Sequence, residues 1–203
     1  MVLTFRILYP HFLSAQPAPA DRLSLGGSNA CLTRTLVFVA ATGHFAGAYV
    51  PSIRSVVEKH PDLIQKAVGA VTVEHLGCRE WLDVRGVYKA TGLKELTLVI
   101  TEFDSTARIM LDAWNGSTDS RSAIVTPTPK GGFNGEGGAL SHAGVPTIGY
   151  IPIPSYLLAG PENGCIEKLD RQHLHAEIGV LTKAVQQIDA MSRAELRTGG
   201  RVS

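Results

Sequence analysis

Four apolar runs constrain the fold of this chain more than any other feature of the sequence. They lie at residues 36–40, 68–73, 96–101 and 147–151. Each run is nearly all apolar, which is typical of strands buried on both faces in a sheet that helices cover. Helical segments separate or follow the runs and begin near Pro51, Asp104 and Asp170. The sequence therefore predicts an α/β protein with three layers, α/β/α, and a mainly parallel central sheet.

The length of 203 residues suits one domain with a substantial core. Residues 1–33 show no clear period and are rich in Pro and Gly, so we expect an irregular or disordered lead there. A single domain is expected over residues 34–192, followed by a frayed tail over residues 193–203. A truncated fragment of a longer protein is an alternative that would also explain the irregular lead.

Composition argues against several kinds of partner. The formal net charge is +1, which leaves no electrostatic footprint for nucleic acid or an anionic membrane. No run approaches the ~20 apolar residues that a membrane span needs. Three widely spaced Cys residues argue against a disulfide framework and a cysteine zinc site. Pro10 and His11 interrupt the apolar N-terminal segment, so a cytoplasmic location is favoured over secretion, although the sequence does not fix the compartment.

Polar or glycine-rich turns accompany three of the apolar runs. Glu74 and His75 directly follow the second run, and His44 follows the first. The turn Asn134-Gly135-Glu136 precedes a short helix of small residues that leads into the last run. Glycines in that turn permit positive φ or a close approach of the backbone to a bound group. Because ligands of such sheets gather outside the carboxyl ends of the strands, we expect these side chains near one edge.

Imidazole and carboxylate groups at one edge suit Zn²⁺, and a nearby carboxylate can act as base towards a metal-bound water. The candidate ligands are His44, His75 and Glu136, with Glu74 as the candidate catalytic base. Alternatively, Glu74 takes the place of His75 as a ligand. Asn134 and Gly135 are candidate substrate-binding residues. The alternative is a chance cluster of polar groups at strand ends, with a glycine-rich loop that shapes a turn and leaves Glu136 solvated.

Four segments of the sequence and their order resemble the co-catalytic di-zinc aminopeptidases. The superfamily of these enzymes includes glutamate carboxypeptidases and the transferrin receptor ectodomain. They are LVFVAATGHFAG, AVTVEHLG, GEGGALSHAGVPTIGYIPIPSY and CIEKLDRQHLHAEIGVLTKAVQQID. The resemblance covers roughly residues 36–190, corresponds to the C-terminal two-thirds of the family, and rests on the order of the motifs. It implies a zinc-exopeptidase-like fold, bound zinc, and a peptide or amide substrate.

Carried over residue by residue, the resemblance implies an incomplete ligand set. The family's Glu-Glu pair falls at Gly43-His44 or His44-Phe45, and its Asp ligand falls at Glu74. Its last His ligand falls at Leu157 or Leu158, whose aliphatic side chains do not coordinate zinc. The remaining candidates would hold one ion rather than the two of the family. Two functions are therefore expected: a zinc-dependent, peptidase-like hydrolase of the aminopeptidase type, or an inactive peptidase-like scaffold that serves as a binding module.

Overall fold

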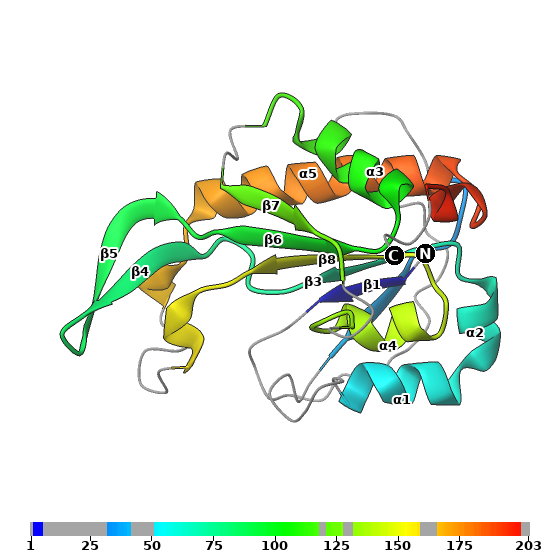
Figure 1. The fold of residues 1–203 in the computed structure, drawn as a ribbon, viewed down its shortest axis with the longest axis horizontal. Helices are drawn as coiled ribbons and strands as arrows, with labels where there is room; N and C mark the ends of the chain where they lie inside the picture. The colour runs from blue at the N-terminus through cyan, green and yellow to red at the C-terminus, as the bar shows by residue number, and fades with distance from the viewer. Residues whose placement is uncertain are drawn as a thin grey trace.

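The structure is a computed structural model, and it describes residues 2–5, 32–41, 51–117, 121–127, 132–158 and 166–199. These residues form a six-stranded sheet with a layer of helices on each face (Figure 1). The predicted fold class, a three-layer α/β protein with a mainly parallel central sheet, is confirmed. In this part of the chain, no helix is long and apolar enough to cross a membrane.

The central sheet has the strand order β2-β1-β3-β8-β6-β7. Its strands are β1 (Val2–Phe5), β2 (Val37–Ala40), β3 (Ala70–Val73), β6 (Thr97–Thr101), β7 (Ser122–Val125) and β8 (Thr147–Pro152). β2, β1, β3 and β8 are parallel to one another, whereas β6 pairs antiparallel with β8 and parallel with β7. The carboxyl ends of β2, β1, β3 and β8 therefore share one edge, which we call the carboxyl edge.

The first strand corrects the expected irregular lead. Val2–Phe5 lies inside the sheet, between β2 and β3, with Val2 opposite both Val37 and Ala70. The rest of the expected lead falls outside the described residues, apart from Leu32 and Thr33. β2 is an edge strand as a consequence of this order, so Phe38 is 48% exposed. The expectation that this apolar run is buried on both faces is therefore wrong.

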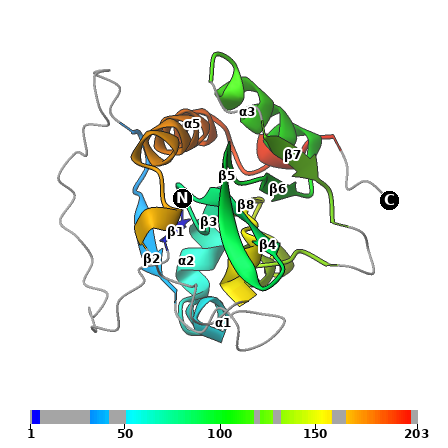
Figure 2. The ribbon, with the colours of Figure 1, turned by 90° about the vertical axis from the view of Figure 1, so that its left-hand side faces the viewer.

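Helices cover the two faces of the sheet unequally. α5 (Arg171–Ala190) and α3 (Asp104–Trp114) lie on one face, and α1 (Pro51–Lys59), α2 (Pro61–Lys66) and α4 (Gly137–His142) lie on the other (Figures 1 and 2). The larger core lies between β3, β8, α3 and α5 and includes Val71, Tyr150 and Val185. Leu196, in the 3-10 helix η4 (Glu195–Arg197), is fully buried in this core. The expected frayed tail is therefore wrong for this segment.

Asp104 and Asp170, near which two helices are predicted to begin, take different positions at the starts of those helices. Asp170 caps α5, because its Oδ1 accepts hydrogen bonds from the backbone N–H groups of Gln172 (2.7 Å) and His173 (3.0 Å). Asp104 is instead the first residue of α3, and the N-cap is Phe103. Ile178 of α5 is 48% exposed although it follows Leu174 at helical spacing.

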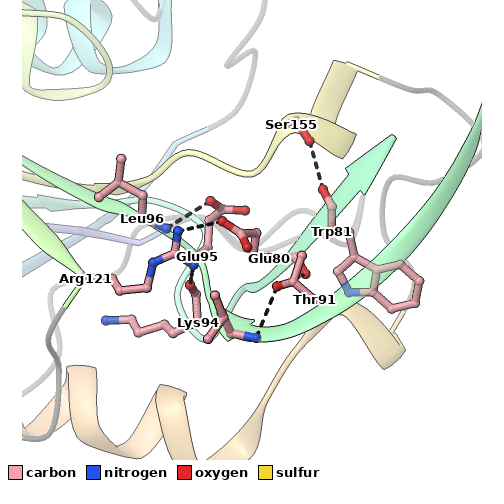
Figure 3. A network of polar contacts seen from close by, with 9 residues as sticks. Glu80, Trp81, Thr91, Lys94, Glu95, Leu96, Arg121 and Ser155 are labelled. Atoms are coloured by element: carbon pink, nitrogen blue, oxygen red, sulfur yellow. Dashed lines mark hydrogen bonds and ion pairs between the residues drawn. The ribbon is translucent and has the colours of Figure 1, made fainter. Parts of the chain in front are cut away.

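A β-hairpin extends beyond the carboxyl edge of the sheet (Figure 1). It consists of β4 (Arg79–Val84) and β5 (Val87–Lys94), which pair antiparallel. Arg121, directly before β7, contacts the base of the hairpin (Figure 3). Its guanidinium donates to the carbonyl oxygen of Lys94 (2.7 Å) and to Glu80 Oε1 (2.6 Å). Arg121 thus joins both strands of the hairpin to the segment that leads into β7.

We expect Arg121→Ala to loosen the hairpin and to lower the free energy of unfolding by about 1–2 kcal/mol at neutral pH. The hydrogen bond from Arg121 lowers the pKa of Glu80. A lowered folded-state pKa stabilises the fold above the unfolded-state pKa of about 4.3, and this contribution is lost as the pH falls through the folded-state pKa. Urea unfolding at a series of pH values should show the difference between wild type and variant shrinking under acid conditions. Lys89→Ala, at an exposed position of β5, is the control, and an equal loss in both variants would contradict the role of Arg121.

Candidate active site

Glu74 directly follows β3 at the carboxyl edge, yet its side chain is only 2% exposed. Its backbone N–H donates to the carbonyl oxygen of Tyr150 (3.0 Å), so the pairing of β3 with β8 continues through this residue. The next residue, His75, has a φ of +50°, which is uncommon for a residue other than glycine. His75 Nε2 lies 3.8 Å from Glu74 Oε2, and the His75 side chain is 6% exposed. A carboxylate and an imidazole are therefore buried side by side at this exit.

The glycine-rich turn before α4 reaches the same place. The backbone N–H of Glu136 donates to Glu74 Oε1 (3.2 Å), and Glu136 is 2% exposed. Gly135 has a φ of +76°, and a Cβ atom at this position would overlap Glu74 Oε1. Glycine is therefore required here for two reasons, the left-handed backbone and the close approach to the carboxylate. We call Glu74, His75, Gly135 and Glu136 the edge cluster.

The edge cluster brings the buried carboxyl group of Glu74 against the imidazole of His75 and the backbone N–H of Glu136, whose own side chain is also buried. An ionised carboxylate is costly to bury unless another group offsets its charge. A bound cation, a shared proton or a protonated imidazole would each offset that cost. The same groups are the donors and proton acceptors that metal-dependent or acid–base hydrolysis uses.

The other residues that the sequence analysis names for the site lie in three different places. Asn134 directly precedes Gly135 in the glycine-rich turn and is exposed to solvent. His44 lies outside the described residues, so its role as a ligand stays a prediction. Leu157 and Leu158, where the family resemblance places the last His ligand, lie in the 3-10 helix η1 (Ser155–Leu158) after β8. Among the residues that the structure describes, no three His, Cys, Asp or Glu side chains form a group that could hold a metal ion.

A third buried acid, which the sequence does not single out as a site residue, lies behind the edge cluster. Glu177 of α5 is fully buried, and its Oε2 accepts from the backbone N–H of Gly77 (2.5 Å). Its Oε1 lies 3.1 Å from Lys94 Nζ and accepts from the hydroxyl of Tyr150 (3.3 Å). The sequence does carry a signal, because Glu177 falls between Leu174 and Leu181 at helical spacing, on the face that should be apolar.

A buried lysine lies where the hairpin packs against the segments after β8. Lys168, in the 3-10 helix η3 (Ile166–Lys168), is 2% exposed, and its Nζ lies 3.8 Å from the centroid of the Trp81 ring. Tyr156 contributes a second aromatic ring to the ammonium. Burial, and the thiol of Cys78 beside it, raise the pKa of the Tyr156 hydroxyl, which therefore stays protonated. These contacts hold the hairpin base against η1 and η3.

Comparison with known proteins supports the fold. No protein-family model matches the chain, and no curated protein sequence matches it. Among solved structures, the chain is similar to an aminopeptidase from Aneurinibacillus sp. strain AM-1, with a TM-score of 0.56 and 12% sequence identity. The match covers 75% of this chain but 33% of the aminopeptidase, so the chain spans about a third of that protein. At this identity the likeness shows the fold alone, and that fold is α/β and exopeptidase-like.

Proposed function

We propose that this chain is a zinc-dependent, peptidase-like hydrolase of the aminopeptidase type that acts on a peptide or amide bond. The observation that carries the proposal is the edge cluster. Glu74 and Glu136 come from segments far apart in the sequence, yet both are 2% exposed and joined by the hydrogen bond from Glu136 N–H to Glu74 Oε1. The carboxyl edge is also where α/β proteins bind their ligands.

The chemistry of the cluster fits zinc, which takes nitrogen and carboxylate oxygen ligands, usually three from the protein at a catalytic site. In the proposed site, His75 and Glu136 are two ligands and His44 supplies the third. When they are ionised, the carboxyl groups of Glu74 and Glu136 carry negative charge that a divalent cation would offset. Zinc, when bound, lowers the pKa of a water molecule and polarises a carbonyl group.

Glu74 is the proposed general base. Its Oε1 accepts a hydrogen bond from the backbone N–H of Glu136 (3.2 Å), which restrains the position of the carboxylate. Its Oε2 lies 3.8 Å from the imidazole of His75, so the proposed base lies next to a proposed ligand. Asn134, exposed on the same turn, is the proposed contact to the substrate amide.

The proposal predicts that the zinc-loaded protein releases the amine from aminoacyl arylamides and that a chelator abolishes this release. We expect Glu74→Gln to lower kcat by at least about 100-fold while zinc content is retained, because it removes the base. Glu58→Gln, which alters an exposed glutamate of α1, is the matched control. Equal rates for wild type and Glu74→Gln would show that Glu74 is not the base.

A binding module on a peptidase-like scaffold is the second candidate. It is favoured by two observations: no three potential ligands are grouped within the described ranges, and leucines stand where the last His ligand of the family would fall. This candidate predicts peptide binding without zinc, unchanged by His75→Ala and without hydrolysis. Isothermal titration with a peptide of free N-terminus, in the presence of a chelator, separates it from the enzyme.

A further inference from the structure

The loop that follows Glu74 has an unusual backbone. His75 has a φ of +50° and Gly77 a φ of +76°. The first of these values is strained for a residue with a Cβ atom, and strained backbone persists only where its surroundings hold it. The direction of the His75 side chain, and hence its contact with Glu74, depends on whatever holds this loop in place.

Helix α5 holds the loop through both backbone groups of Gly77. The N–H of Gly77 donates to Glu177 Oε2 (2.5 Å), and its carbonyl oxygen accepts from the N–H of Asp170 (2.7 Å). The approach is close, because a Cβ atom on Gly77 would lie 3.0 Å from the Cβ atom of Leu174. The loop is therefore fastened to the first turns of α5 on one side and to β3 on the other.

Glu177 is itself fixed by its neighbours. It is fully buried, with Lys94 Nζ at 3.1 Å and the Tyr150 hydroxyl at 3.3 Å from Oε1. A hydrogen bond from an N–H group to a carboxylate is shorter and stronger than one to a neutral acceptor. Lys94 is the last residue of the hairpin strand β5, and Tyr150 belongs to β8. The carboxylate of Glu177 therefore contacts the hairpin, the sheet and the loop.

We propose that Glu177 is a positioning residue, which sets the geometry of His75 relative to Glu74 through its hydrogen bond to the backbone of Gly77. Its consequence for metal affinity rests on the proposed function, whereas its consequence for His75 does not. Groups that orient a metal ligand typically change metal affinity by roughly 10- to 100-fold when they are removed.

Two double variants isolate the hydrogen bond from the buried charge. K94M/E177Q removes both charges but keeps an oxygen that accepts from Gly77 N–H, whereas K94M/E177L removes both charges and the acceptor. The readouts are the ring signals of His75 in the NMR spectrum of the metal-free protein, assigned with His75→Ala, and titration with Zn²⁺ alone. Asp189→Asn is the control for general destabilisation, because Asp189 is a buried acid of α5 that accepts from the N–H of Thr33 (2.7 Å), away from the loop.

We expect K94M/E177L to displace the His75 signals and to raise the Kd for Zn²⁺ by roughly 10- to 100-fold. K94M/E177Q and Asp189→Asn should keep both near wild type. Unchanged His75 signals in K94M/E177L would overturn the proposal. If K94M/E177L does not fold, Glu177→Asp gives the same comparison, because its carboxylate is one methylene further from Gly77. Wild-type protein that binds no Zn²⁺ would refute the proposed function, while the His75 signals would still decide the role of Glu177.

Discussion

Lys94→Met should lower the free energy of unfolding by about 3–5 kcal/mol, because it removes the cation beside a fully buried carboxylate. Lys94 Nζ lies 3.1 Å from Glu177 Oε1, and the Lys94 side chain is 10% exposed. Methionine preserves most of the volume of the side chain, so the loss reports the charge rather than a cavity. Urea unfolding followed by circular dichroism measures the change.

The matched control is Arg54→Met, which removes the cation of an exposed ion pair on α1. Arg54 Nε lies 2.7 Å from Glu58 Oε1, closer than the atoms of the buried pair, but the two side chains are 67% and 59% exposed. We expect a much smaller loss there, because solvent screens an exposed ion pair. K94M/E177Q, which leaves no buried charge at either position, should recover most of the loss of Lys94→Met. Equal losses in Lys94→Met and Arg54→Met would refute the buried charge pair as a source of stability.

Gly135→Ala should lower the free energy of unfolding by about 2–5 kcal/mol. The left-handed backbone costs a residue with a Cβ atom roughly 1–2 kcal/mol, and overpacking typically adds about 1–3 kcal/mol. The overpacking arises because the new methyl group would overlap Glu74 Oε1 and lie 2.9 Å from Ile151 Cδ1. Since Glu74 must move to relieve the overlap, the variant should also lose the activity assigned to the edge cluster.

Gly86→Ala separates the two causes. Gly86, in the hairpin turn, has a φ of +83°, and a Cβ atom there would have nothing within 4 Å. Only the backbone cost of roughly 1–2 kcal/mol is therefore expected. The difference between the two alanine variants in urea unfolding measures the contact between Gly135 and Glu74. Equal losses would mean that the turn does not press against the carboxylate.

The parts of the fold that the sequence predicts well are those whose burial is uniform. β3 and β8 are buried along their whole length, and their continuous apolar runs identify them. The strand Val2–Phe5 escapes the same reasoning because Arg6 follows it at once and Pro10 and His11 come shortly after, so the segment shows only a short, broken apolar run. The antiparallel direction of β6 is likewise not encoded in its own side chains, since a buried strand has the same composition in either direction.

The candidate site also has one contact that the sequence predicts and one that it does not. The meeting of Glu74 with the turn at Glu136 follows from strand topology, because the turn opens a helix that runs back along the sheet before β8. The contact of Lys94 with Glu177 has no such rule behind it. It joins a hairpin to a helix across a long stretch of sequence, and only the acid on the apolar face of α5 hints at it.

The zinc content of the purified protein, measured beside His75→Ala by elemental analysis, tests the central claim most directly. The edge cluster with His44 should hold about one zinc ion per chain, retained through dialysis, because three protein ligands suffice for a catalytic zinc site. His75→Ala should lose that ion. A wild-type protein without zinc, or equal zinc in both proteins, would contradict the proposed metal site and leave the exopeptidase-like fold with another function.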